Sequence, residues 1–135
     1  MAGIVLIDSG PIVAVLNKRD VRHAWAARHF EDYEGFITCE AVLSEVFFLL
    51  RADSHATAKF CAILEEGVLT VRSLGQHLSA IAQLIRRYSN LPMSYADACL
   101  VRLAELDDTA TVFTTDSDFR VYRKHGHQVI PLLSP

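Results

Sequence analysis

The chain has 135 residues, 51% of them hydrophobic, and a formal net charge of −3 at pH 7. This length suits one domain, expected over residues 1–135, and is too short for two independent cores. No apolar run approaches the roughly 20 residues of a membrane-spanning helix, and the N-terminus lacks the features of a signal peptide, so we expect a cytoplasmic protein without membrane contact. The negative charge disfavours a protein that binds nucleic acid by charge alone, but it is compatible with a nuclease whose metal ions meet the phosphate.

Short apolar runs alternate with helical patterns along the chain. The first run, residues 4–7, is apolar throughout, which is typical of a strand buried on both faces. Thr38 and Ser94 are expected N-caps of two later helices. In chain order we predict a strand at 4–7, helices at 11–16 and 22–30, a strand at 35–38, helices at 38–51 and 56–66, a strand at 68–71, helices at 76–88 and 94–106, a strand at 111–114, a short helix at 118–124 and a strand at 129–130.

This alternation predicts βαβ units, and hence a single α/β domain with a central parallel sheet of about five strands and helices on both faces. The helix at 38–51 is apolar on nearly every side, so we expect it to be largely buried. Cys39, Cys61 and Cys99 form no Cys-x-x-Cys pair, and we expect each to be a buried small hydrophobe.

Four acids are expected at the carboxyl ends of the strands, where open parallel sheets bind ligands. Asp8 follows the first strand, Asp116 follows the fourth, Asp97 lies in the first turn of a helix, and Glu45 lies two turns into the helix after the second strand. The three aspartates also have structural explanations as helix caps, with Asp97 completing a capping box that starts at Ser94. Glu45 is harder to explain structurally, because a buried carboxylate is costly unless it is paired or binds metal.

Taken together, the four acids favour a metal site. Carboxylates within several ångströms of one another repel strongly even at an effective dielectric constant of about 20, so such a cluster needs protons or a cation. Oxygen ligands suit Mg²⁺ or Mn²⁺ better than zinc. One or two such ions are the usual apparatus for the attack of water on a phosphodiester, and no histidine base is then required.

Short motifs around the same acids carry a resemblance to a known family, which the chain follows from residue 4 to residue 130. The chain resembles the PIN-domain family, in particular the toxin ribonucleases of VapC type. The motifs are a hydrophobic strand ending in Asp8-Ser9, then Ser44-Glu45-Val46, Tyr95-Ala96-Asp97-Ala98 and Thr114-Thr115-Asp116-Ser117-Asp118-Phe119.

The resemblance implies a PIN fold and Mg²⁺- or Mn²⁺-dependent endoribonuclease activity. It also implies an antitoxin protein partner and a homodimer. Glu40 is the rival of Glu45 for the second acidic position, but an offset of five residues places it about 140° around the helix, where it reads as a first-turn residue. The implied catalytic and metal-binding residues are Asp8, Glu45, Asp97 and Asp116, with Ser9, Thr115 and Asp118 as auxiliary residues; Ser9 would orient Asp8 or contact metal-bound water.

Candidate contacts to the RNA are basic residues near the expected site, although a solvated helix face is the favoured explanation for each of them. His125 and His127 point to different faces of any strand and read as surface residues. The alternative to an enzyme is a PIN-like module that holds RNA or a protein partner without cutting. The candidate contacts are Arg86, Arg87, Arg120, Arg123 and Lys124.

Overall fold

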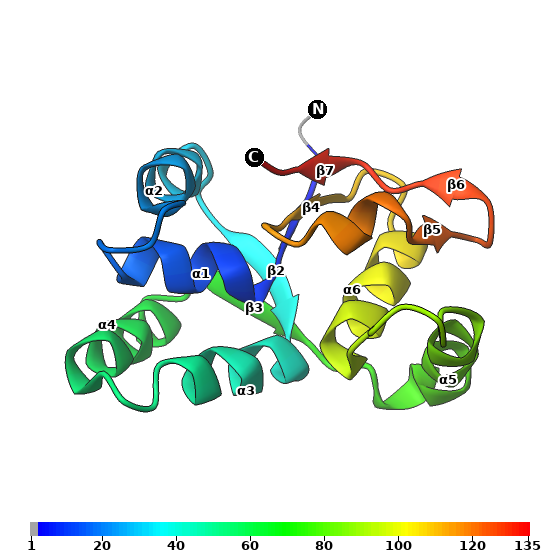
Figure 1. Cartoon of the computed structure of the whole chain (residues 1–135), viewed down its shortest axis with the longest axis horizontal. Coiled ribbons are helices and arrows are strands. Elements are labelled where there is room, and N and C mark those ends of the chain that lie inside the picture. The colour runs from blue at the N-terminus through cyan, green and yellow to red at the C-terminus, as the bar shows by residue number, and fades with distance from the viewer. Residues whose placement is uncertain (1–2) are drawn as a thin grey trace.

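The computed structural model describes residues 3–135, which form a five-stranded sheet with helices around it (Figure 1). Every neighbouring pair of strands in this sheet is parallel. The predicted α/β fold with a parallel sheet of about five strands is therefore confirmed. In order across the sheet, the strands are β3 (Leu69–Arg72), β2 (Phe36–Cys39), β1 (Val5–Ile7), β4 (Thr111–Phe113) and β7 (Leu132–Leu133).

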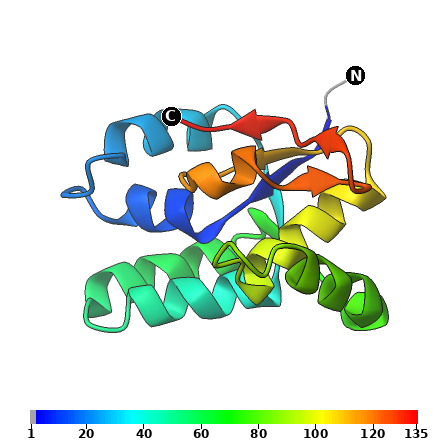
Figure 2. The same ribbon diagram turned by 45° about the vertical axis from the view of Figure 1, so that its right-hand side comes forward.

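Helices lie on both sides of the sheet, as the two views show (Figure 1 and Figure 2). On one side, the ring of Trp25 packs edge-on against Phe113, with 5.3 Å between the ring centroids. None of the helices in residues 3–135 is long and apolar enough to cross a membrane. The helices are α1 (Ser9–Leu16), α2 (His23–Glu31), α3 (Glu40–Leu49), α4 (Ser54–Glu65), α5 (Leu78–Arg87) and α6 (Tyr95–Leu106), with two short 3₁₀ helices, η1 (Gly75–His77) and η2 (Ser117–Arg120).

The core is continuous across the central strand and α6. Leu6 and Ile7 of β1 are fully buried, because β1 has a strand on each side and helices above and below. Eight of the twelve residues of α6 are buried, and this helix contacts β1, β2 and β4. The buried centre of the molecule therefore includes β1, which Asp8 follows directly, and α6, which carries Asp97.

The C-terminal segment differs from the prediction. The predicted helix at 118–124 is wrong, because η2 ends at Arg120 and β5 (Arg123–Lys124) follows. β5 pairs antiparallel with β6 (Gln128–Val129), so the fifth strand of the main sheet is β7 rather than the predicted strand at 129–130. His125 and Gly126 join β5 to β6 with φ angles of 53° and 81°, and positive φ at two successive residues is the signature of a tight hairpin turn.

Three other expectations about local structure are wrong. Thr38 does not cap α3, because its hydroxyl donates a hydrogen bond to the Ile7 carbonyl of the neighbouring strand, at 2.9 Å. The face of α3 that carries Phe48 and Leu49 is exposed rather than buried. Cys61 is also exposed, whereas Cys39 and Cys99 are buried as expected.

Candidate active site

Asp8 lies at the carboxyl end of β1 and is 4% exposed. Its main-chain N–H continues the sheet by donating to the Phe113 carbonyl at 3.0 Å. One carboxylate oxygen accepts a hydrogen bond from the Ser9 N–H and the other from the Thr114 hydroxyl, both at 2.8 Å. Asp8 is thus fixed by the sheet on one side and by the first residue of α1 on the other.

Thr114 links Asp8 to Asp116, a role that the sequence analysis missed. The hydroxyl of Thr114 donates to Asp8 and also accepts a hydrogen bond from the Asp116 N–H, at 3.0 Å. The signal that finds Thr114 is strand register. Ile7 pairs with Phe113, so one further step along the two parallel strands places Asp8 beside Thr114.

Glu45 joins the cluster through Ser9. The hydroxyl of Ser9 donates to one carboxylate oxygen of Glu45 at 2.8 Å, which connects the first turn of α1 to the middle of α3. The resemblance implied that this hydroxyl orients Asp8 or contacts metal-bound water. In the structure the hydroxyl donates to Glu45, and the main-chain N–H of Ser9 donates to Asp8. Contact with metal-bound water stays a prediction.

Asp97 approaches from the first turn of α6. The predicted capping box is confirmed, because the Asp97 N–H donates to the Ser94 hydroxyl and the Asp97 carboxylate accepts from the Ser94 N–H. The same carboxylate oxygen lies 3.3 Å from the hydroxyl of Tyr122, a fully buried residue that follows η2. No sequence signal predicts this contact, because it depends on how η2 returns the chain to α6.

Burial and like charge together raise the pKa of two of these acids. Burial of Asp8, with added repulsion from Asp97 and Glu45, raises its pKa to about 7 despite the hydrogen bonds from Thr114 and Ser9. Burial also raises the pKa of Asp97, and the charges of Asp116 and Glu45 add to that effect. Each of the four predicted acids therefore contributes to the electrostatic field of another, and we call Asp8, Glu45, Asp97 and Asp116 the acidic quartet.

The other two auxiliary candidates lie at the edge of the quartet. The Asp118 N–H donates to the Asp116 carboxylate at 2.9 Å. Burial of the Tyr122 hydroxyl, followed by the charges of Asp97, Asp118 and Asp116, raises the pKa of Tyr122, which places Asp118 in the same field. Thr115 packs so closely against α1 that a Cβ on Gly10 would collide with its hydroxyl, and Thr115 donates no hydrogen bond to a quartet acid within residues 3–135.

Comparison with known proteins now identifies the family. A sequence model of the PIN domain matches residues 5–125. The chain belongs to the PIN domain family. Comparison with curated protein sequences gives no match. Among solved structures, the chain is similar to the crystal structure of the Mycobacterium tuberculosis VapC20, described as a toxin that cleaves the sarcin-ricin loop, with a TM-score of 0.76 and 21% identity over 87% of this chain and 93% of that one.

The donor chemistry of the quartet of this PIN domain fits a hard divalent cation. No three His, Cys, Asp or Glu side chains in residues 3–135 are close enough to form a ready-made chelate. Magnesium, however, usually takes one or two protein carboxylates and completes its shell with water and phosphate oxygens. Asp97, Asp116 and Glu45 each use only one carboxylate oxygen in the side-chain hydrogen bonds of the described residues, so the other oxygen of each is free to bind a cation.

No described cation neutralises the quartet. The ion pairs within residues 3–135 join His29 to Asp32 and Arg102 to Glu105, and neither contains a quartet acid. The side chains of the five candidate RNA contacts likewise make no hydrogen bond to the quartet in this part of the chain. The quartet is therefore a concentration of negative charge without an internal counter-ion.

Two of the candidate RNA contacts lie far from Asp97. Lys124 is 6% exposed, and its charge lowers the pKa of Asp107, after larger effects of hydrogen bonds from Thr109. Asp107 is the C-cap of α6, about 15 Å along the helix from Asp97 at 1.5 Å per residue. Arg87 donates to the Gly126 carbonyl at 2.6 Å, also in the β5–β6 hairpin. The geometry gives no support for these two residues as contacts of the scissile phosphate.

The remaining candidates are Arg86, Arg120 and Arg123. Arg86 is exposed in the last turn of α5. Arg123 donates to three main-chain carbonyls at the end of η2, and Arg120 donates to Ser134 and Pro135. The guanidinium groups of Arg120 and Arg123 thus stabilise the C-terminal segment, and RNA contact by these three residues stays a prediction.

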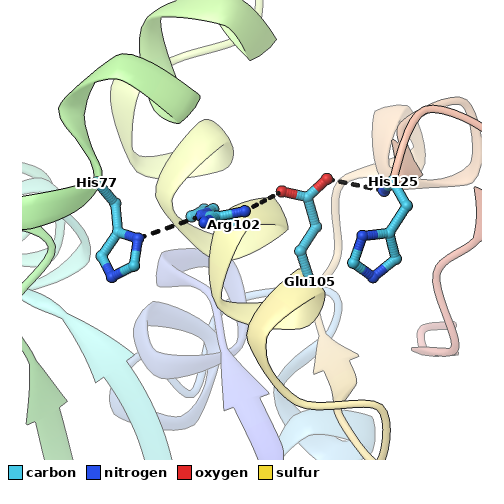
Figure 3. Close-up of polar contacts among 4 residues, drawn as sticks. All are labelled: His77, Arg102, Glu105 and His125. Atoms are coloured by element: carbon cyan, nitrogen blue, oxygen red, sulfur yellow. Dashed lines mark hydrogen bonds and ion pairs between the residues drawn. The ribbon is translucent and has the colours of Figure 1, made fainter.

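A polar network holds the hairpin against α6 (Figure 3). Arg102 lies between His77 and Glu105, donating to the first at 3.3 Å and pairing with the second at 3.2 Å. The other carboxylate oxygen of Glu105 accepts the His125 N–H at 2.7 Å, in the turn of the hairpin. This network holds the β5–β6 hairpin, which directly follows Tyr122, against the C-terminal half of α6. It thereby helps to keep Tyr122 in contact with Asp97 at the start of the same helix.

Replacing Thr114 by Val is expected to destabilise the PIN domain by about 1–3 kcal/mol, because Asp8 loses a donor and the Asp116 N–H loses an acceptor at a buried position. The change preserves side-chain shape, so packing is maintained. Urea denaturation measures the free energy of unfolding. Thr111→Val, at the start of the same strand and without a side-chain hydrogen bond in the described residues, is the control, and equal stability of the two variants would contradict the assigned role of Thr114.

Proposed function

We propose that this PIN domain is a metal-dependent endoribonuclease that hydrolyses RNA phosphodiesters and serves as the toxin of a toxin–antitoxin pair in the cytoplasm. The observation that carries the proposal is the acidic quartet, in which four carboxylates converge without a described counter-ion. Charge of this kind attracts a hard dication, and RNA is the substrate class suggested by the structural likeness to VapC20. One or two Mg²⁺ or Mn²⁺ ions are proposed.

The quartet acids and Ser9 have different roles in such a site. A bound Mg²⁺ or Mn²⁺ supplies positive charge to the phosphate and lowers the pKa of the attacking water. Asp97, Asp116 and Glu45 present their free carboxylate oxygens as ligands, and Asp8 completes the negative field. Ser9 fixes the orientation of Glu45, at 2.8 Å. The quartet acids are held by hydrogen bonds before substrate arrives, so little reorganisation is needed during the reaction.

The direct test is RNA cleavage by the purified protein. A pool of structured RNAs is incubated with Mg²⁺ or Mn²⁺, with and without EDTA, and cleavage products are mapped at nucleotide resolution. Defined internal cuts that disappear in EDTA support the enzyme. RNA that binds equally well with EDTA and stays uncut supports the alternative, a non-catalytic PIN-like module, and overturns the proposal.

Thermal melting tests the metal site without reference to activity. Millimolar Mn²⁺ is expected to raise the melting temperature of the wild type, because an ion that binds only the folded state stabilises it by about 2.7 kcal/mol at a hundred times its Kd. Asp8→Asn is expected to show a smaller rise, since one source of the negative field is gone. NaCl of equal ionic strength is the control for screening, and an unchanged wild-type melting curve contradicts the site.

An antitoxin protein and a second copy of the chain are the proposed partners. Support for protein partners comes from apolar side chains that remain exposed on α3, with Leu49 51% and Phe47 37% exposed. Trp25 and Phe30 are half-buried and pack on Phe113 and Phe36, so they offer less apolar surface to a partner. Light scattering of the purified protein measures whether it forms a dimer.

A further inference from the structure

A groove of about 460 Å³ opens directly beside the acidic quartet. One wall comes from α3 and includes Glu45 and Phe48, and the other comes from the start of α6 and includes Ser94 and Tyr95. It is shallow and open, so it suits a flat ligand better than one that needs enclosure. We call it the aromatic groove, because an aromatic residue stands on each wall.

Both rings are exposed although they are large and apolar. Phe48 is 60% exposed and Tyr95 is 48% exposed. Phe48 lies one turn after Glu45 on the same face of α3, where side chains three positions apart are about 5–6 Å from each other at Cβ. Tyr95 follows Ser94, whose hydroxyl caps Asp97. Each ring therefore stands next to a quartet acid or to the residue that holds one.

Charge is arranged across the groove in a way that selects its occupant. Glu45 is one of the lining residues, so a phosphate group is disfavoured beside it. Arg51 lies over the ring of Phe48, with its guanidinium carbon 3.9 Å from the ring centroid, and donates to the Phe48 carbonyl at 2.7 Å. Arg51 does not line the groove, but its positive charge lies against the ring of Phe48, which does. A ligand with a flat neutral part and an attached anion matches this order.

We propose that the aromatic groove binds an unpaired base of the RNA next to the scissile phosphate, with Phe48 and Tyr95 stacking on the base and Arg51 meeting the neighbouring phosphate. The proposal rests on the proposed function and narrows it to RNA whose bases are splayed out at the cut. Proteins that recognise single-stranded loops commonly stack bases on aromatic rings, whereas the bases of a continuous duplex are already stacked on one another. The preferred substrates are therefore loops, bulges and single strands.

The test combines variants that lack one aromatic ring with RNAs that lack one base. Phe48→Leu is expected to raise KM for a cleaved RNA loop about tenfold with little change in kcat, because a stacked base is worth about 1–3 kcal/mol of binding. Tyr95→Leu is expected to act similarly and Tyr95→Phe to retain wild-type KM. Two further RNAs are compared, one with an abasic nucleotide before the cut and one with an abasic nucleotide after it. On the RNA that lacks the base bound in the groove, wild type and Phe48→Leu are expected to have the same KM.

Tyr33→Leu is the matched control. Tyr33 is also an exposed aromatic residue, at 40%, but it packs beside Phe36, the first residue of β2, at the end of the strands opposite to the quartet. The proposal is overturned if wild type and Phe48→Leu have the same KM on intact RNA, or if their difference persists on both abasic RNAs. A change in oligomeric state of Phe48→Leu with unchanged KM overturns it in favour of contact with a second copy.

A binding measurement separates this proposal from the proposed function. Single-stranded RNA that contains one 2-aminopurine is titrated with Asp97→Asn, with and without Phe48→Leu, and stacking is read from quenching of the 2-aminopurine fluorescence. If the wild type cuts no RNA but quenching depends on Phe48, the nuclease proposal fails, and the binding of an unpaired base in the groove stands without it. If the wild type cuts RNA and quenching is independent of Phe48, the groove proposal fails alone.

Discussion

Replacing Asp97 by Asn is expected to lower RNA cleavage by more than about a hundredfold while the fold is retained. Outer partners of metal ligands already cost about 10–100-fold when mutated, and Asp97 is proposed as a ligand itself. The amide oxygen of Asn still accepts the Ser94 N–H, so the capping box and the start of α6 are preserved. The loss therefore comes from the missing charge.

The measurement is kcat/KM on a mapped RNA, with circular dichroism and melting temperature recorded for each variant. Glu40→Gln is the matched control, because Glu40 is an exposed acid in the first turn of α3 and is not part of the quartet. We expect it to cleave within about twofold of the wild type, as is usual for surface substitutions. If Asp97→Asn keeps an activity close to that of Glu40→Gln, Asp97 is not part of the active site.

Stability without divalent cations is expected to fall as pH rises from about 4 to about 7, and Asp8 is the principal cause. Its pKa is about 7 in the folded chain and 3.8 as an unperturbed carboxyl, so the folded state binds the proton more tightly than the unfolded state. The resulting stabilisation is fully present below the unfolded pKa and is lost as pH rises through the folded one. At about 1.4 kcal/mol per pH unit, the loss approaches about 4 kcal/mol.

Asp8→Asn is expected to remove most of this dependence and to be the more stable protein at pH 8 in EDTA, since the amide has no charge to bury. Chemical denaturation at pH 5 and pH 8 measures the free energy of unfolding of both proteins. Glu40→Gln is expected to keep the wild-type dependence. Parallel pH profiles for wild type and Asp8→Asn would show that the buried charge of Asp8 is not what limits stability.

The sequence predicts those parts of the fold and the site that follow from short-range patterns. The apolar run that ends at Asp8 has the burial and direction of a central parallel strand, and one rule about strand ends suffices to bring Asp8 and Asp116 together. Asp97 is found because Ser94 and Asp97 show the spacing of a capping box. These inferences need only the local chain and the general geometry of a parallel sheet.

What the sequence does not predict depends on contacts between distant segments. The residues after Asp118 look helical, but the turn at His125 and Gly126 and the hydrogen bond from Glu105 favour a hairpin instead. Tyr122 could not be assigned to the site because that hairpin positions it. The helix around Phe48 is apolar enough to suggest burial, yet no element of residues 3–135 covers that face, so periodicity alone mispredicts its exposure.

The hydrogen bond between Asp8 and Thr114 joins residues 106 positions apart, and the hydrogen bond between Tyr122 and Asp97 joins residues 25 positions apart. Asp8, Glu45 and Asp97 are thus each held by a hydrogen bond from a residue distant in the sequence, so the full set of these contacts forms only when most of the chain is present. During translation, the hydrogen bonds that hold Asp8 and Asp97 cannot form until Thr114 and Tyr122 have been synthesised. The proposed ribonuclease therefore completes its site only late in the synthesis of the chain.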